Sequence, residues 1–243
     1  MFYSSFGIFT PQESHLERGA IPNCLLNFFC SVIIPSRAFL RRLIDVTVGI
    51  QCPHHLRLSK DVKEDLKVWQ SFLANFNGRS FFLEETWYSS TKPDLYTNAS
   101  GALGFGAIFG SRWCFGKWPA SWSYRNIAIL EFYTIVLSLY SWGHAMHNRC
   151  ILFFTDNESL VHVFNKQSSK DKSLMFFVRK LVLICLEYNN FVFKANHIAD
   201  VKNGLANSLS RLQVQYFKQL APTHMDKLPT EIALHLQPQS WQP

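Results

Sequence analysis

Residues 94–110 read DLYTNASGALGFGAIFG, and this stretch decides the fold expected for the chain. It contains two strand-like segments, residues 95–99 and 104–109, and a third follows at 111–118. Gly110 and Ser111 separate the last two segments and are typical of a hairpin turn. The stretch therefore predicts three consecutive strands.

Alternating helices and strands follow downstream. Residues 127–142 form a predicted helix with a helical repeat of side chains that includes Leu130 and Leu137. ILFFTDN at 151–157 is a continuous apolar strand ending in two polar residues, which is how a buried strand delivers a functional side chain. The remaining elements are helices at 157–166 and 172–188, the strand FVFKANH at 191–197, and a helix at 202–212. The order predicts an α/β fold with a mixed five-stranded sheet flanked by helices.

The chain divides into four regions by character. Residues 1–34 show no clean periodicity and stay unassigned. Residues 35–93 form a small helical segment, and the α/β domain spans residues 94–212. The tail, residues 213–243, carries several Pro and Gln residues, which predicts a linker.

The helical segment has recognisable helix starts. Ser36 and Ser59 are each predicted to cap a helix. From Ser59 onward, apolar residues including Val62 and Trp69 fall on one helical stripe. The segment is too small to stand alone comfortably, so we expect it to accompany the α/β domain.

Composition and charge narrow the class of protein. The 243 residues are 48% hydrophobic and 17% charged, which is enough to build a buried core. The net charge of +7 favours a polyanionic partner such as nucleic acid, although a modest basic excess is common. Six scattered cysteines with no C-x-x-C pair, and no segment resembling a signal peptide or a membrane span, predict an intracellular protein, cytoplasmic or nuclear, with no membrane partner.

Four positions stand out by their location in the predicted elements. They are Asn98 on the first strand, Glu131 in the apolar helix, Asp156 at the end of the fourth strand, and Asn207 in the last helix. Because an unpaired buried carboxylate is costly, Glu131 is expected to have a partner or a cation. A rim position with access to solvent is the alternative interpretation.

Motifs around these positions resemble a known family. They are T-N-A-S-G at 97–101, L-E at 130–131, F-T-D-N at 154–157 and H-I-x-x-x-x-N-x-x-A-N-x-L-S-R at 197–211. In this order and spacing they resemble the RNase H domain of retrotransposon reverse transcriptases, in particular of DIRS-type elements, which encode a tyrosine recombinase. Residues 35–93 similarly resemble part of the connection region that precedes RNase H in such elements.

The resemblance implies an RNase H-like fold and a nuclease. Members of the family have Asp, Glu, Asp and Asp at the four positions, and these carboxylates hold two Mg²⁺ ions that cleave the RNA strand of an RNA–DNA hybrid. Only a cluster of carboxylates, some of them bridging, can hold two divalent cations close together. The candidate catalytic residues are Asn98, Glu131, Asp156, Asn207 and His197, of which the first four are candidate metal ligands.

The chain departs from the family at two of these four positions. Asn98 and Asn207 stand where the family has Asp, so neutral amides of the same shape replace two carboxylates. We expect Mg²⁺ or Mn²⁺ to bind weakly if at all, and the rate to fall by several orders of magnitude at ~1.4 kcal/mol per factor of ten. Asp200, where the family has Gly, is a third departure. An impaired or inactive RNase H is expected.

The resemblance also implies contacts with nucleic acid and with other parts of the element's polyprotein. Candidate contacts with an RNA–DNA hybrid are Ser100, Gly101, Asn157, Lys166 and Lys172. The basic stretch at 166–180 either grips the backbone or is a solvated face, and the aromatic residues at 113–124 either stack on nucleic acid or pack internally. A non-catalytic nucleic-acid-binding module and a non-functional remnant of a decayed element are the alternatives to a nuclease.

Overall fold

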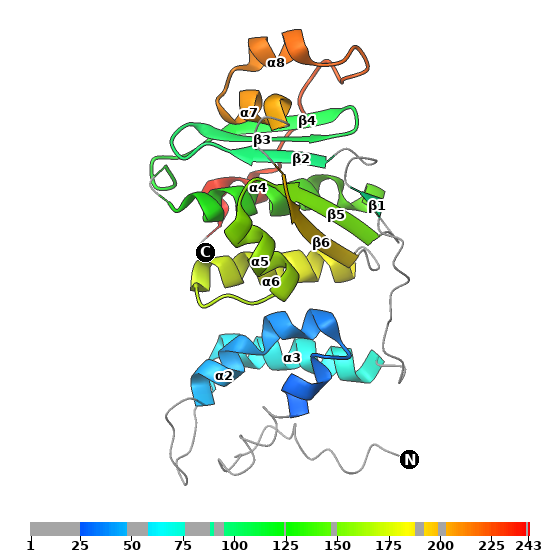
Figure 1. Cartoon of the computed structure of the whole chain (residues 1–243). Helices are drawn as coiled ribbons and strands as arrows, with labels where there is room; N and C mark the ends of the chain where they lie inside the picture. Colours follow the sequence, from blue (N-terminus) through cyan, green and yellow to red (C-terminus); the bar gives the residue numbers. More distant parts are fainter. Residues whose placement is uncertain are drawn as a thin grey trace. The chain divides into compact units, whose positions relative to one another are not determined.

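The structure of the protein is a computed structural model (Figure 1), which describes residues 25–47, 58–75, 88–89, 95–123, 125–146, 150–187, 192–198, 203–241 and 243. Two units divide the chain, Met1–Leu83 and Glu84–Pro243. The division falls ahead of the predicted boundary between residues 93 and 94. The physical reason is strand β1 (Tyr88–Ser89), which pairs with a strand of the second unit.

The first unit contains the predicted helical segment. Its elements are the 3-10 helix η1 (Ile34–Phe39) and the α-helices α2 (Arg41–Thr47) and α3 (Lys60–Asn75). Trp69 of α3 is fully buried, and its indole nitrogen donates to the carbonyl oxygen of Phe39 at 3.3 Å. Arg42 of α2 forms an ion pair with Asp65 of α3 at 3.2 Å. These contacts hold α3 against η1 and α2.

The two predicted helix caps have different outcomes. Ser59 is confirmed, because its hydroxyl oxygen accepts the backbone N–H of Val62 at 3.3 Å. The prediction for Ser36 is wrong: this residue lies buried inside η1, and its hydroxyl donates to the carbonyl oxygen of Ile33 at 2.6 Å. η1 begins at Ile34, and its N-cap position is Ile33, three residues before Ser36. Pro35 lies in the first turn, where its fixed φ is suited to a helix and its missing N–H costs no hydrogen bond.

The three consecutive strands are confirmed. The antiparallel sheet consists, in this order, of β2 (Leu95–Ala99), β3 (Gly104–Phe109) and β4 (Arg112–Lys117). Phe109 pairs with Arg112 across a two-residue turn, in which Gly110 has a φ of +59° that favours glycine. Asn98 pairs with Gly106 within the β2–β3 ladder.

The prediction of a single five-stranded sheet is wrong for the described residues. A second, parallel sheet has the order β1–β5–β6, with β5 at Cys150–Thr155 and β6 at Val192–His197. β1 pairs with one edge of β5 and β6 with the other. β2 approaches β5 without forming a ladder with it, so the unit is a mixed α/β domain with two three-stranded sheets.

Helices cover both faces of the antiparallel sheet, as Figure 1 shows. The helices after β4 are α4 (Ile127–Trp142), followed by the 3-10 helix η2 (Gly143–Met146), then α5 (Glu158–Lys166), α6 (Lys172–Glu187) and α7 (Gly204–Ser210). α4 packs on one face of β2 and β3 and also against α6, while α7 packs on the opposite face. The predicted helices are confirmed, with ends that differ by one or two residues.

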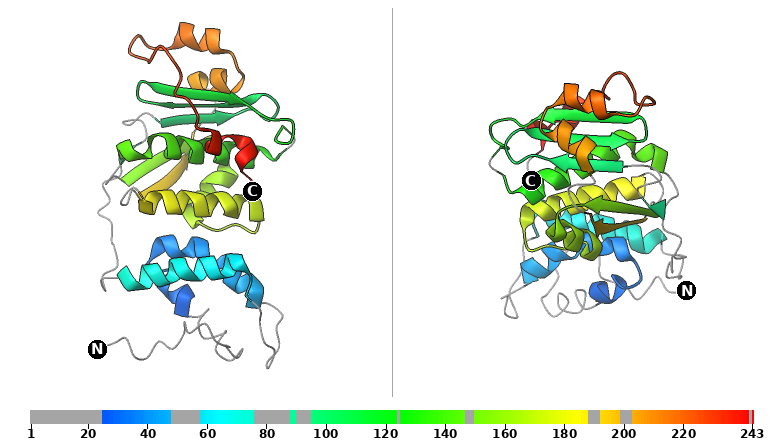
Figure 2. Two further views of the ribbon diagram at one scale, coloured as in Figure 1. Left: turned by 180° about the vertical axis from the view of Figure 1, so that it is seen from behind. Right: turned by 45° about the horizontal axis from the view of Figure 1, so that its top comes forward.

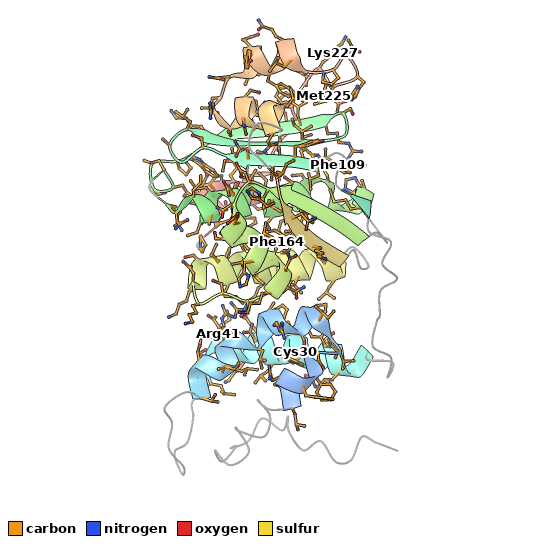
Figure 3. All side chains as sticks on the ribbon, in the orientation of Figure 1. Cys30, Arg41, Phe109, Phe164, Met225 and Lys227 are labelled. Atoms are coloured by element: carbon orange, nitrogen blue, oxygen red, sulfur yellow. The ribbon has the colours of Figure 1, made fainter. Side chains whose placement is uncertain are left out.

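The core of the second unit is aromatic and centres on α4. Thirteen of the sixteen residues of α4 are buried, which is why its sequence shows little contrast between two faces. Phe109 stacks on Trp142 with ring centroids 6.0 Å apart, and Phe164 packs on Phe132 at 4.7 Å. Figure 3 labels Phe109 and Phe164 among the side chains of this unit. In the described part of the chain, no helix is both long enough and apolar enough to span a membrane.

The tail at 213–243 is packed on the domain, and its prediction as a linker is wrong. It contains α8 (Val214–Leu220) and the 3-10 helices η4 (Leu234–Leu236) and η5 (Pro238–Ser240). The backbone N–H of Thr230 donates to the carbonyl oxygen of Trp113 on β4 at 2.7 Å, and the Tyr133 hydroxyl donates to the carbonyl oxygen of Leu236 at 2.9 Å. Figure 2 shows the red segment returning to α4. A few buried anchors such as Trp241 fix it despite its Pro and Gln content.

Candidate functional site

Asn98 and Asn207 meet in the folded chain, although 109 positions separate them in the sequence. The side-chain nitrogen of Asn98 on β2 donates to the side-chain oxygen of Asn207 on α7 at 2.6 Å. The same nitrogen donates to the hydroxyl of Ser210 at 3.1 Å. Both N–H groups of the Asn98 amide are therefore used within the protein.

The packing of α7 on the sheet makes this contact geometrically possible. Gly106 lies opposite Asn98, and a Cβ at Gly106 would collide with the Cβ of Leu209 and lie 2.9 Å from the nitrogen of Ser210. Only glycine lets the helix come this close. The Asn203 side chain adds a further link by donating to the carbonyl oxygen of Thr97 at 2.9 Å.

The sequence interpretation missed the role of this helix face. Asn203, Asn207 and Ser210 are spaced i, i+4 and i+7, so they lie on one side of a helix. Three polar residues on one face are a signal for a shared partner, and that partner is β2. What the spacing alone could not reveal is which strand the face would meet.

Glu131 is the second part of the candidate site. It is 8% exposed, so the buried interpretation is confirmed and the rim interpretation is wrong. Burial is the main cause that raises its pKa to about 7; the negative charge of Asp156 also raises it, and a hydrogen bond from Asn157 lowers it. Its Oε2 atom has no hydrogen-bond partner among the described residues. A carboxyl group in this setting is partly protonated at neutral pH.

Asp156 and Asn157 follow β5 directly and link it to α5. The side-chain oxygen of Asn157 caps α5 by accepting the backbone N–H groups of Ser159 at 3.1 Å and Leu160 at 3.3 Å. Its side chain also bonds to Glu131. Asn157, a candidate nucleic-acid contact, is thus engaged inside the protein and positions Glu131 relative to α5.

His197 ends β6 beside Asp156. Its register partner on β5 is Thr155, which brings the two strand ends together. The Nε2 atom of His197 lies 3.2 Å from the backbone carbonyl oxygen of Asp156, and the side chain is exposed. The histidine is therefore close to the backbone of a candidate ligand, and no contact with Glu131 is seen among the described residues.

The two groups of candidate residues lie on neighbouring elements. α4, which carries Glu131, packs against β2, which carries Asn98. β2 also approaches β5, whose end carries Asp156. Asn98 is hydrogen-bonded to Asn207, and Glu131 lies within reach of the charge of Asp156.

The remaining nucleic-acid candidates lie outside these two groups. Ser100 and Gly101 are in the turn between β2 and β3, where the carbonyl oxygen of Ser100 accepts the indole N–H of Trp118 at 2.7 Å. A side chain at Gly101 would meet nothing within 4 Å, so the glycine is not required for packing. Lys166 and Lys172 are exposed at the facing ends of α5 and α6.

Burial decides between the two interpretations of the aromatic residues at 113–124 and narrows the exposed part of the basic stretch. Trp113, Trp118 and Trp122 are 1%, 4% and 2% exposed, so they pack in the core and are not available for stacking on bases. Arg179 is also buried, and Lys180 lies over the Trp241 ring at 5.7 Å. The exposed basic residues of the stretch 166–180 are therefore Lys166, Lys170 and Lys172. Asp200 and Tyr124 lie outside the described residues.

The donor set does not fit the pair of divalent cations that the resemblance implies. Among the residues that the structure describes, no group of three His, Cys, Asp or Glu side chains could hold a metal ion. Asn98 directs N–H groups, which repel cations, at the Asn207 oxygen. Glu131 and Asp156 are the two carboxylates left at the four positions, too few to balance two divalent ions.

Comparison with known proteins adds no relative. No family model matches this chain, and no curated protein matches it.

Proposed function

We propose that the second unit is an RNase H-like domain of a DIRS-type retrotransposon reverse transcriptase, and that the helical segment before it belongs to the connection region. The ancestral activity is hydrolysis of the RNA strand in RNA–DNA hybrids. The support is the order of the four motifs, together with their distribution over β2, α4, the end of β5 and α7. An antiparallel meander followed by parallel strands is compatible with this assignment.

In this chain the nuclease activity is impaired or absent. The observation that carries this conclusion is the 2.6 Å hydrogen bond from Asn98 to Asn207 at the two positions where the family has carboxylates. An amide pair that satisfies itself offers a cation little negative charge. Several kcal/mol of lost metal affinity correspond to a loss of several orders of magnitude in rate at ~1.4 kcal/mol per factor of ten.

The experiment is cleavage of an RNA–DNA hybrid with a labelled RNA strand, in Mg²⁺ and separately in Mn²⁺. The full chain is compared with Asn98→Asp/Asn207→Asp, which restores both carboxylates. The unmodified chain is expected to cut slowly or not at all, and the double variant is expected to cut. Efficient cutting by the unmodified chain would show that two carboxylates and two amides suffice.

Two controls make the assay decisive. Adding Glu131→Gln to the double variant removes a carboxylate without changing its shape and is expected to abolish the restored cutting. A DNA–DNA duplex of the same sequence is expected to stay intact. If the double variant folds and binds the hybrid but never cuts it, the RNase H assignment is wrong.

A non-catalytic nucleic-acid-binding module is the second candidate function. The observation in its favour is a row of exposed lysines, Lys166, Lys170 and Lys172, none of which forms an ion pair with another described residue. Binding of the unmodified chain to labelled hybrid should weaken with salt, and Lys166→Gln/Lys170→Gln/Lys172→Gln should reduce that salt dependence. Lys218→Gln, on exposed α8, is the matched control.

A further inference from the structure

The link between Asn98 and Asn207 is a closed hydrogen-bonded ring and involves more than a single contact. The Asn98 amide donates to the Asn207 oxygen and to the Ser210 hydroxyl oxygen, at 2.6 and 3.1 Å. The Ser210 hydroxyl in turn donates to the backbone carbonyl oxygen of Asn207 at 2.9 Å. Ser210 is fully buried, whereas Asn98 and Asn207 are half-buried, so the Ser210 hydroxyl is the part of the ring that is shielded from water.

The ring sits where α7 is pressed against the sheet. Ala206 and Leu209 of α7 are fully buried on β3, and Gly106 leaves no room between strand and helix. The Asn203 amide bonds to the backbone of β2 one residue before Asn98. The polar contacts and the apolar packing thus hold the same two elements together.

The chemistry of the pair depends on one partner being a donor. A carboxylate has only acceptors at neutral pH, so two carboxylates at these positions would face each other oxygen to oxygen and would need a cation or a proton between them. An amide at position 98 supplies the hydrogen atoms itself. The contact closes with no charge to neutralise.

We infer that Asn98, Asn207 and Ser210 form a cation-independent clamp that fixes α7 on β2, so this part of the fold needs no metal ion. Asn98 is the donor of the clamp, and the side-chain oxygen of Asn207 is an acceptor in it. The clamp follows from the contacts alone, and only its comparison with an ancestral carboxylate pair rests on the proposed function.

The donor and acceptor roles predict unequal effects of two isosteric changes. Asn207→Asp keeps an oxygen facing the Asn98 amide, so it should lower the melting temperature in EDTA less than Asn98→Asp does. Asn98→Asp removes both donated hydrogen bonds and should lower the melting temperature by roughly 4–10 °C. The double variant sets two carboxylates against each other and should lose more than the sum of the two single variants.

The experiment is a thermal melt of the full chain and of these variants in EDTA, followed by circular dichroism. Gln219→Glu, an exposed amide on α8, controls for the added charge and should melt like the unmodified chain. If the double variant does not fold, Asn98→Ala/Asn207→Ala and its single variants replace it, and a combined loss smaller than the sum supports one shared contact. Additive losses in either set would overturn the clamp.

Excess Mg²⁺ separates the clamp from the proposed function. Mg²⁺ should raise the melting temperature of Asn98→Asp/Asn207→Asp and leave that of the unmodified chain unchanged. A double variant that neither responds to Mg²⁺ nor cuts the hybrid would refute the proposed nuclease ancestry, while non-additive losses in EDTA would still support the clamp. Additive losses in EDTA together with restored cutting would support the ancestry and overturn the clamp.

Discussion

Replacing Trp241 with alanine tests whether the C-terminal segment is part of the folded domain. Trp241 is 6% exposed, although the composition around it is that of a linker. Its ring stacks on Phe177 at 5.6 Å and meets Tyr133 and Tyr140 edge-on at 5.3 and 5.9 Å. Trp241→Ala would remove all of these ring contacts and leave a cavity between α4 and α6.

The size of the effect follows from this burial. A buried Trp→Ala change costs about 3–5 kcal/mol, and this range already includes the aromatic contacts. For a domain of this length, each kcal/mol lowers the melting temperature by about 2–4 °C, so a drop of roughly 6–20 °C is expected. The cation–π contact of Lys180 with the ring, at 5.7 Å, would be lost as well.

The assay is a thermal melt and a urea titration of the full chain, both followed by far-ultraviolet circular dichroism. Tyr216→Ala is the control, because Tyr216 is an aromatic residue on α8 that is 52% exposed and should cost less than about 0.5 kcal/mol. If Trp241→Ala melts within about 2 °C of the unmodified chain, the C-terminal segment is not packed on the core and the reasoning is wrong.

Three further changes test the site and its support. Gly106→Ala should lower the free energy of unfolding by about 1–3 kcal/mol in a urea titration, because its Cβ would collide with α7. The Cβ of Gly101→Ala has free space, so this control should be nearly neutral. Equal losses in the two variants would contradict the reasoning. In metal-free buffer, the free energy of unfolding should fall by at most about 3 kcal/mol as the pH rises from about 4.5 to about 7, because the pKa of Glu131 in the folded state is raised to about 7, mainly by burial, and the protonated form stabilises that state. Glu131→Gln should flatten this pH dependence. If the pH dependence is unchanged in Glu131→Gln, other groups cause it. Asn157→Ala should destabilise α5 by about 1 kcal/mol and raise the pKa of Glu131, which carboxyl NMR can follow. Asn157→Asp should keep the helix cap. If the pKa of Glu131 does not change in Asn157→Ala, Asn157 does not hydrogen-bond to Glu131.

The sequence by itself determined the local elements of this protein. The helix at α4, the strands of the meander and the cap at Ser59 follow from side-chain periodicity and from residues with strong local preferences. It also marked Glu131 as a candidate buried acid in an apolar helix, with a rim position as the alternative, and the exposed fraction of 8% decided between them. The polar face of α7, at Asn203, Asn207 and Ser210, was equally readable from spacing.

Only the tertiary structure decided which of these elements meet. β5 pairs with the two-residue strand β1, which lies outside the predicted domain of residues 94–212, and β2 belongs to a separate sheet. The Trp241 ring packs on Tyr133 and Phe177, which are more than sixty positions away in the sequence. Amino-acid composition carries no information about such contacts. Asn98 bonds to Asn207 because Gly106 lets α7 touch the sheet. Long-range contacts depend on the shapes of the packed side chains and on the space between the elements, and local sequence patterns give no information about either.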